Sequence, residues 1–172
     1  MFSVIAVQRL EALDSNLVSD VMDVGGLANQ VLSPSIKSLE PGSLYFGTAG
    51  CSRGLVLEKK NKPYTEASIC DIDAALFPGA GIVLENGGPA TCATIGGFVA
   101  RSWQALGSTV MLTDGLVRDS GEIIDLGYPL FSRGTCPAFP QGRWVLVEVG
   151  GTVFLPARQE GKTVTVKDGD LI

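Results

Sequence analysis

The sequence contains no histidine. This absence excludes, within a single chain, the Ser-His-Asp and Cys-His arrangements of nucleophilic catalysis, and it excludes zinc sites that have histidine ligands. Any acid–base chemistry must therefore come from carboxylates, lysine, tyrosine, cysteine or water bound to a metal ion.

Long apolar runs and basic clusters are also missing. No stretch of 18 apolar residues occurs, and the start of the chain, Met1 to Arg9, has no basic segment before its short apolar run. These features predict a cytoplasmic protein that is neither exported nor inserted into a membrane. With 13 basic and 18 acidic residues the net charge is −5, and no basic cluster exceeds the run 58–62. Nucleic acid is therefore a poor candidate for the primary ligand.

Cysteine is sparse and scattered. The four cysteines form no C-x-x-C pair and lie at Cys51, Cys70, Cys92 and Cys136. This spacing favours reduced thiols in a cytoplasmic protein over a disulfide framework, and we expect each cysteine to be a small buried apolar residue.

The rest of the composition is typical of one globular domain. At 172 residues, with 45% apolar and 18% charged residues, the chain is long enough to bury a real core. We therefore expect residues 1–172 to form a single domain. The segment Gly169 to Ile172 looks like the beginning of a strand, which leaves open that a natural C-terminus was trimmed.

Apolar spacing in the first half predicts short helices followed by strands. The expected elements are helices at 3–13 and 17–24, strands at 43–47 and 51–58, and a helix at 65–77. Asp14-Ser-Asn16 offers a stop and a new N-cap between the first two helices, and Thr65 is a candidate cap for the third.

The second half predicts a βαβ unit and then strands. A strand at 82–84, a helix at 94–106 and a strand at 109–113 form the unit, which needs a right-handed crossover. An extended segment at 127–131 and strands at 143–149, 152–155 and 163–167 follow. The predicted fold class is therefore α/β, with short N-terminal helices, several short strands and a β-rich C-terminal third.

The stretch from Leu112 to Asp119 is the strongest candidate for a site. An apolar strand that runs into Asp-Gly, followed by a guanidinium beside a carboxylate, indicates a strand end that opens into a polar pocket. Arg118 can bind an anionic oxygen with two donors while Asp119 holds a hard cation. The alternative is a surface ion pair after a turn, which is the commoner case for an isolated Arg-Asp pair.

A second candidate feature precedes this stretch. The helix that opens on Gly96 would leave unpaired backbone amides at Gly97, Phe98 and Val99 in its first turn. Such amides can bind a carboxylate or a phosphate group. Trp103 and Trp144, by contrast, are expected in the core or an interface more often than against a ligand.

The combined motif, Gly96-Gly97 through Gly107 to Asp114-Gly-Leu-Val-Arg118-Asp119, resembles one known family. This family holds 4-hydroxy-4-methyl-2-oxoglutarate aldolase and the regulator of ribonuclease activity A, and it is often described as dimethylmenaquinone methyltransferase-like. Three further segments are similar to the family: Val18-Ser-Asp20-Val-Met-Asp23, Gly81-Ile-Val-Leu-Glu-Asn86-Gly87 and Val166-Lys-Asp-Gly169-Asp170.

The resemblance implies a fold and an activity. It implies a swivelling β/β/α-type fold that assembles as a homotrimer or a dimer of trimers, with sites at subunit boundaries. It also implies a lyase that cleaves 4-hydroxy-2-oxo acids to pyruvate with Mg²⁺ or Mn²⁺ and decarboxylates oxaloacetate. Arg118 would then hold the keto or enolate oxygen, Asp119 would bind the metal, and the amides of Gly97 to Val99, after Gly96, would bind the substrate carboxylate.

The sequence departs from the family pattern at two positions. Gly97 stands where the aldolases carry an acidic residue, and Glu85 stands where they carry aspartate. Glu122, or a carboxylate of a neighbouring subunit, could replace the acidic group that is missing at position 97.

Three functions therefore stay open. The intact pair Arg118-Asp119 favours a metal-dependent 2-oxo acid lyase, whose enolate chemistry needs no histidine. Gly97 favours a non-catalytic regulator that binds a ribonuclease or helicase. The third function is a protein that binds a small oxo acid or phosphate without transforming it.

Overall fold

The computed structural model describes residues 13–27, 30–42, 44–57, 68–140 and 144–172. Its centre is a six-stranded sheet with the order β1-β7-β5-β3-β2-β8. The strands are β1 (Lys37–Ser38), β2 (Thr48–Val56), β3 (Ala80–Glu85), β5 (Val110–Thr113), β7 (Leu130–Ser132) and β8 (Trp144–Val149). The four inner strands β2, β3, β5 and β7 are parallel, and β1 and β8 add antiparallel edges.

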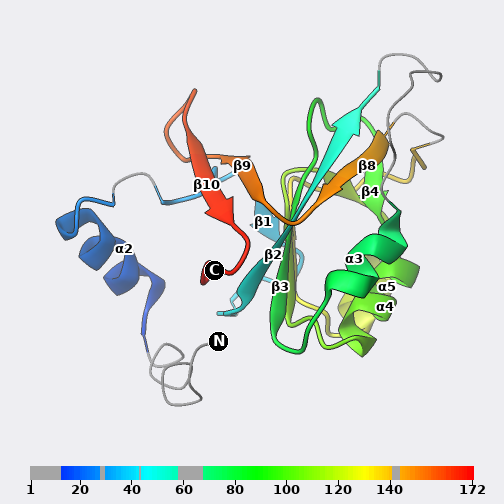
Figure 1. Cartoon of the computed structure of the whole chain (residues 1–172), viewed down its shortest axis with the longest axis horizontal. Coiled ribbons are helices and arrows are strands. Elements are labelled where there is room, and N and C mark those ends of the chain that lie inside the picture. The colour runs from blue at the N-terminus through cyan, green and yellow to red at the C-terminus, as the bar shows by residue number, and fades with distance from the viewer. Residues whose placement is uncertain (1–12, 28–29, 43, 58–67, 141–143) are drawn as a thin grey trace.

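Helices cover one face of this sheet. They are α3 (Ile69–Ala75), α4 (Gly97–Ala105) and α5 (Ser120–Asp125), on the right of Figure 1. Their core includes Trp103, Met111 and Ile123, which are completely buried. The strand β3, Ala-Gly-Ile-Val-Leu-Glu, is apolar up to its last residue because both of its faces are covered.

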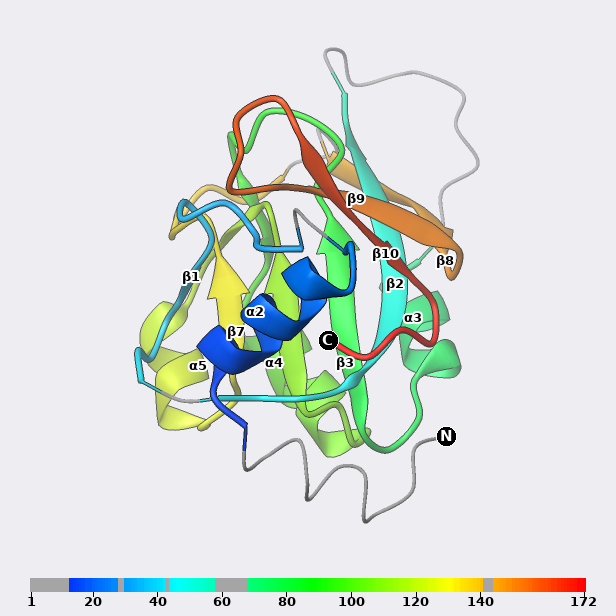
Figure 2. The ribbon, with the colours of Figure 1, turned by 90° about the vertical axis from the view of Figure 1, so that its left-hand side faces the viewer.

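A hairpin and a helix lie over the other face, on the left of Figure 1 and in front in Figure 2. The hairpin pairs β9 (Thr152–Pro156) with β10 (Thr163–Lys167), and the helix is α2 (Ser15–Val24). Val153, Leu155, Val164 and Val166 point into a second apolar core against β2 and β3. This pattern agrees with the strict alternation in β10.

A small parallel ladder stands apart from the main sheet. It joins β4 (Ala93–Ile95) to β6 (Leu116–Val117). The strand β4 leads directly into α4, and β6 is followed by Arg118, Asp119 and α5. This ladder therefore brings the two candidate features of the sequence next to each other.

The predicted α/β class, the βαβ unit β3-α4-β5 and the β-rich C-terminal third are confirmed. The helix predicted at 17–24 is also confirmed as α2, and Asp14 caps it by accepting the N–H of Asn16. However, α2 has no buried residue, and Val24 is 92% exposed. The helix predicted at 3–13 falls outside the described residues except for its last position.

Several predicted boundaries are wrong. Residues 44–47 form no strand, and β2 runs unbroken through Gly50 from Thr48. Ser68 caps α3 through a capping box with Asp71, and the predicted cap Thr65 lies outside the described residues. The helix expected from 94 starts at Gly97, because residues 93–95 pair with β6 instead. Residues 169–172 form a turn and a single bridge to Thr48, not the beginning of a strand.

Two further expectations concern exposure. Cys51 and Cys92 are buried as predicted, but Cys70 is exposed on α3 and Cys136 is half-buried. Burial and the nearby Asp168 and Asp170 raise the pKa of the Cys51 thiol to about 12. None of the helices in the described ranges is long and apolar enough to cross a membrane.

Candidate functional site

The β4–β6 ladder positions the site. The N–H of Arg118 donates to the carbonyl of Ile95 at 3.0 Å, and Val117 is paired with Ile95 in the ladder. The Gly96-Gly97 step, which opens α4, therefore lies against Arg118 and Asp119, which precede α5. The two features were predicted as parts of one site, and the structure brings them together.

Asp119 has an unusual backbone. Its φ of 57° is the only positive value at a non-glycine position in the described ranges. Aspartate tolerates this left-handed conformation better than most residues, but the strain persists only where the surroundings fix it, as they often do at functional sites. Asp119 is the N-cap of α5, yet its side chain does not cap that helix. The carboxylate instead accepts the N–H of Gly97 at 3.2 Å and lies 3.4 Å from Nε of Arg118.

Gly96 is required by close packing. A Cβ at this position would lie 2.5 Å from Oδ2 of Asp119 and 2.9 Å from Nε of Arg118. Only a residue without a side chain can therefore occupy the position while both groups keep their places.

Glu122 occupies the space next to Gly97. A Cβ at Gly97 would overlap with the carboxylate of Glu122, and that carboxylate forms an ion pair of 2.9 Å with Arg101 of α4. Both Asp119 and Glu122 thus place carboxylate oxygens against the Gly96-Gly97 step. The side chains of Asp119 and Glu122 are 42% and 45% exposed, so both carboxylates are open to solvent.

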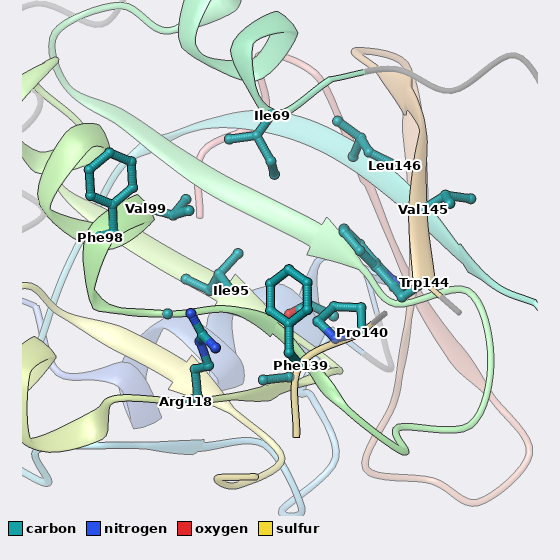
Figure 3. A pocket seen from close by; sticks show the side chains of 13 residues that line it. Ile69, Ile95, Phe98, Val99, Arg118, Phe139, Pro140, Trp144, Val145 and Leu146 are labelled. Carbon is teal, nitrogen blue, oxygen red and sulfur yellow. The ribbon is translucent and has the colours of Figure 1, made fainter. Parts of the chain in front are cut away.

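A cavity of about 450 Å³ opens beside Arg118 (Figure 3). The rest of its wall comes from the start of α3, from β4 and the first turn of α4, from two residues that follow β7, and from β8. The lining residues are Ile69, Ala93, Thr94, Ile95, Gly96, Phe98, Val99, Arg118, Phe139, Pro140, Trp144, Val145 and Leu146. The cavity is more apolar than the predicted polar pocket, because Arg118 is the only charged residue among the lining residues that the structure describes.

Two polar side chains of this wall already have partners. The hydroxyl of Thr94 donates to the carbonyl of Leu116 at 3.1 Å, and the indole N–H of Trp144 donates to the carbonyl of Asn86 at 3.1 Å. The ring of Phe139 lies 5.1 Å from Cζ of Arg118, within cation–π range. Trp144 is thus a core residue, as predicted, that also lines the cavity.

Of the remaining predicted residues, Phe98 and Val99 line the cavity and Glu85 does not. Phe98 is 82% exposed at the cavity, and Val99 is half-buried there. The amide of Gly97 is taken by Asp119, which leaves those of Phe98 and Val99 without partners in their own helix. Glu85 is not in the cavity wall, because its carboxylate accepts the N–H of Phe154 at 2.9 Å and ties β3 to β9.

Asp114 supports the site without lining the cavity. Its carboxylate accepts the N–H of Asn86 at 2.6 Å, which links the ends of β3 and β5. Burial raises the pKa of Asp114, and Glu85 adds to the shift, whereas the hydrogen bond from Asn86 opposes it.

Ile69, Phe139 and Pro140 lie in the cavity wall although the sequence did not predict them there. These residues are far from the glycine and Arg-Asp motifs in sequence, and only the tertiary fold brings them near Arg118. No sequence pattern indicated that Phe139 would line a site, because it lies in a segment without helix or strand.

The carboxylates of the site suit a hard divalent cation. No group of three or more histidine, cysteine, aspartate or glutamate side chains that could hold a metal occurs in the described part of the chain. Mg²⁺ and Mn²⁺ do not require such a group, since Mg²⁺ is usually held by one or two carboxylates, water and substrate oxygens. Asp119 and Glu122, both exposed and near one backbone step, fit this kind of site.

Comparisons with known proteins point to one family. The pattern of the RraA-like family, described as Aldolase/RraA, matches residues 15–172. A protein of Halalkalibacterium halodurans that is provisionally named 4-hydroxy-4-methyl-2-oxoglutarate aldolase is 29% identical over 169 residues, which are 96% of this chain and 70% of the relative.

Solved structures show the same fold. An uncharacterized protein from Pseudomonas syringae pv. tomato str. DC3000 is 26% identical, with a TM-score of 0.78 over 99% of this chain and 74% of that one. RraAS2 of Streptomyces coelicolor, described as an unusual member of the RNase ES inhibitor RraA protein family, has a TM-score of 0.83 at 19% identity. The match covers 99% of this chain and 81% of RraAS2, and at this identity it shows the fold alone.

Proposed function

Because the chain belongs to the RraA-like family (Aldolase/RraA), we propose that it is a C–C lyase that releases pyruvate from a 2-oxo acid with Mg²⁺ or Mn²⁺. The reactions are the cleavage of 4-hydroxy-2-oxo acids and the decarboxylation of oxaloacetate. The name of the Halalkalibacterium relative supports this activity. The proposal rests mainly on Asp119. Its backbone is in the left-handed conformation, its carboxylate does not cap α5, and that carboxylate lies beside Arg118.

Each site residue has a chemical role in this proposal. Asp119 and Glu122 would hold the divalent ion, which supplies a positive charge for the keto and carboxylate oxygens of the substrate. Arg118 donates hydrogen bonds to the keto oxygen and stabilises the enolate charge that develops there. The amides of Phe98 and Val99 bind the substrate carboxylate.

In the decarboxylation, the C3–C4 bond of oxaloacetate breaks and CO₂ leaves from C4. The electron pair of the bond moves to C3 and, by delocalisation, to the C2 oxygen beside Arg118. The resulting enolate then takes a proton from water at C3 and becomes pyruvate. Electrostatic stabilisation of the enolate by Arg118 is the main contribution of the protein to this step.

The test is release of pyruvate from oxaloacetate and from 4-hydroxy-4-methyl-2-oxoglutarate with Mg²⁺ or Mn²⁺. We expect release above a blank that contains the metal alone, and we expect Asp119→Ala to abolish it. An unchanged rate in Asp119→Ala would show that the site assignment is wrong, and the lack of any release above the blank would refute the activity on these acids.

A second candidate is a non-catalytic regulator that binds a ribonuclease or helicase. Gly97 favours it, because the position carries no acidic side chain and Glu122 is engaged with Arg101. A pull-down that recovers neither kind of partner, together with a positive lyase assay, would exclude this function. A protein that binds an oxo acid without turnover would give a calorimetric signal with pyruvate and no product.

We also propose a homotrimer, or a hexamer of two trimers. The support is the apolar side of α2, where Leu17, Val21 and Val24 are exposed to solvent in the single chain. A contact with other copies would cover these side chains. A monomer mass by light scattering at micromolar concentration would contradict this assembly.

A further inference from the structure

We propose that Phe139 is a positioning residue, whose ring holds the guanidinium of Arg118 in the direction that meets the oxygen on which charge develops. This role rests on the proposed function, in which Arg118 stabilises the enolate. It adds to the reaction a residue that is 60% exposed and comes from a segment distant from Arg118 in sequence. Figure 3 shows the ring of Phe139 beside the guanidinium.

Gly96, Asp119 and Phe139 are neighbours of the Arg118 side chain. Cγ and Nε of Arg118 pack against the backbone of Gly96, where a Cβ would come within 2.9 Å of each atom. Nε also lies 3.4 Å from Oδ2 of Asp119. The ring centroid of Phe139 lies 5.1 Å from Cζ. Among these three contacts, only the ring lies beyond Nε and can limit how the forked end of the guanidinium turns.

The segment that carries the ring is tied to the framework of the site, although it lies outside the helices and strands. The N–H of Val117 donates to the carbonyl of Gly134 at 3.1 Å, and the N–H of Cys136 donates to the carbonyl of Val117 at 2.8 Å. The N–H of Ala93 donates to the carbonyl of Ala138, the residue before the ring, at 3.0 Å. The segment is therefore anchored to both strands of the β4–β6 ladder, which also places Arg118.

Two prolines stiffen the same segment. Pro137 and Pro140 have fixed φ angles, and each proline restricts the residue before it to extended backbone. Phe139 precedes Pro140 and is one of these restricted residues. A ring on such a backbone can hold a neighbouring group in place even though the ring itself is partly exposed.

The charge on the reacting oxygen decides when this positioning matters. The keto oxygen of a bound 2-oxo acid is neutral, whereas the enolate oxygen carries a negative charge. A hydrogen bond to a charged acceptor is about twice as strong as one to a neutral acceptor. An arginine that must first be ordered loses part of this gain as the charge develops. Phe139 therefore acts on turnover more than on substrate binding.

Steady-state kinetics of oxaloacetate decarboxylation with Mg²⁺ test this role. We expect Phe139→Leu, which keeps an apolar side chain, to lower kcat by about two- to fivefold with little change in KM, as for loss of an exposed cation–π contact. Phe139→Tyr keeps the ring and should restore kcat. A rise in KM at unchanged kcat would show that Phe139 only packs against the substrate, and it would overturn the inference.

Phe154→Leu is the matched control. Phe154 is 47% exposed on β9 and is not among the residues that line the cavity, so the same exchange there should leave kcat and KM unchanged. If Phe154→Leu lost as much kcat as Phe139→Leu, the exchange would act on the fold in general, and the role of Phe139 would be contradicted.

Calorimetry gives a second readout that does not depend on turnover. Oxalate carries a negative charge where the enolate oxygen lies, whereas pyruvate presents a neutral keto oxygen there. With Mg²⁺, Phe139→Leu should weaken oxalate binding by about two- to fivefold and leave pyruvate binding nearly unchanged. In the Arg118→Ala background, Phe139→Leu should cause no further loss, because nothing is left for the ring to position. The same loss in both backgrounds would show that the ring contacts the ligand itself, against the inference.

The two measurements separate this inference from the proposed function. Pyruvate release with the same kcat in the parent protein and Phe139→Leu refutes the inference alone. Binding of oxalate by the parent protein without pyruvate release refutes the lyase, and the oxalate affinities of the parent protein and Phe139→Leu still decide whether the ring positions Arg118. If the parent protein neither releases pyruvate nor binds oxalate, both fail.

Discussion

Two regions of opposite character meet at the Gly96-Gly97 step. On one, the carboxylates of Asp119 and Glu122 are exposed to solvent and suited to a hard cation. On the other lies a mostly apolar cavity, in which the side-chain donors of Thr94 and Trp144 are paired and Arg118 is the only cation among the described lining residues. The difference suggests a division of work, in which the carboxylates determine whether a bound acid reacts and the cavity determines which acid binds.

Arg118 contacts both regions, so its loss should have the largest effect. We expect Arg118→Ala to lower kcat/KM for pyruvate release by about 10²–10³-fold, because it removes both the grip on the substrate and the stabilisation of the enolate. Arg118→Lys should recover only part of the loss, since a lysine cannot donate two parallel hydrogen bonds. Steady-state kinetics, with circular dichroism as the control for folding, would check both variants. A full recovery by lysine would show that the charge alone acts.

Gly96 lies between the two regions, and the lack of a side chain there leaves room for Arg118 and Asp119. Gly96→Ala should reduce turnover by about 10²-fold, because the new methyl group displaces the groups of Arg118 and Asp119 that act on the reacting oxygens. Gly121→Ala is the matched control, since a methyl group there meets open space on α5. The control should keep its activity and gain roughly 0.5–1 kcal/mol in unfolding free energy, because alanine favours a helix over glycine. Equal activities of the two variants would contradict the packing account.

The carboxylate region can be tested by moving its second acidic group. Glu122→Ala should weaken Mn²⁺ binding by about tenfold, a typical cost for a lost supporting group at a metal site. Gly97→Asp in the Glu122→Ala background should restore part of the affinity, because the new side chain enters the space that Glu122 left. In the parent protein, Gly97→Asp should bring no gain, since it overlaps with Glu122. Unchanged Mn²⁺ affinity in Glu122→Ala would remove Glu122 from the site.

Much of the fold could be predicted because its signals are local. The apolar run of β3, the alternation in β10 and the spacing in α4 each lie within one segment. The boundaries of β2 and β4, by contrast, depend on pairing with strands that are distant in sequence. Gly50 does not break β2 because parallel pairing with β3 holds it, and 93–95 leave the helix because β6 pairs with them.

The candidate site divides in the same way. Gly96, Gly97, Arg118 and Asp119 could be found from the sequence because they lie in two short motifs. The apolar nature of the cavity could not, because Ile69 and Phe139 come from distant segments that carry no pattern of their own. The left-handed backbone of Asp119 was also not predictable, since the tertiary contacts and not the residue type impose it.

A Mn²⁺ titration of the purified protein tests most directly whether Asp119 holds a divalent cation. Asp119→Asn is the appropriate variant, because asparagine also tolerates a positive φ and keeps the shape of the side chain while it removes the charge. We predict saturable Mn²⁺ binding to the parent protein that weakens by about tenfold or more in Asp119→Asn, with unchanged thermal unfolding. Equal Mn²⁺ affinity of the two proteins would contradict the assignment of the metal site.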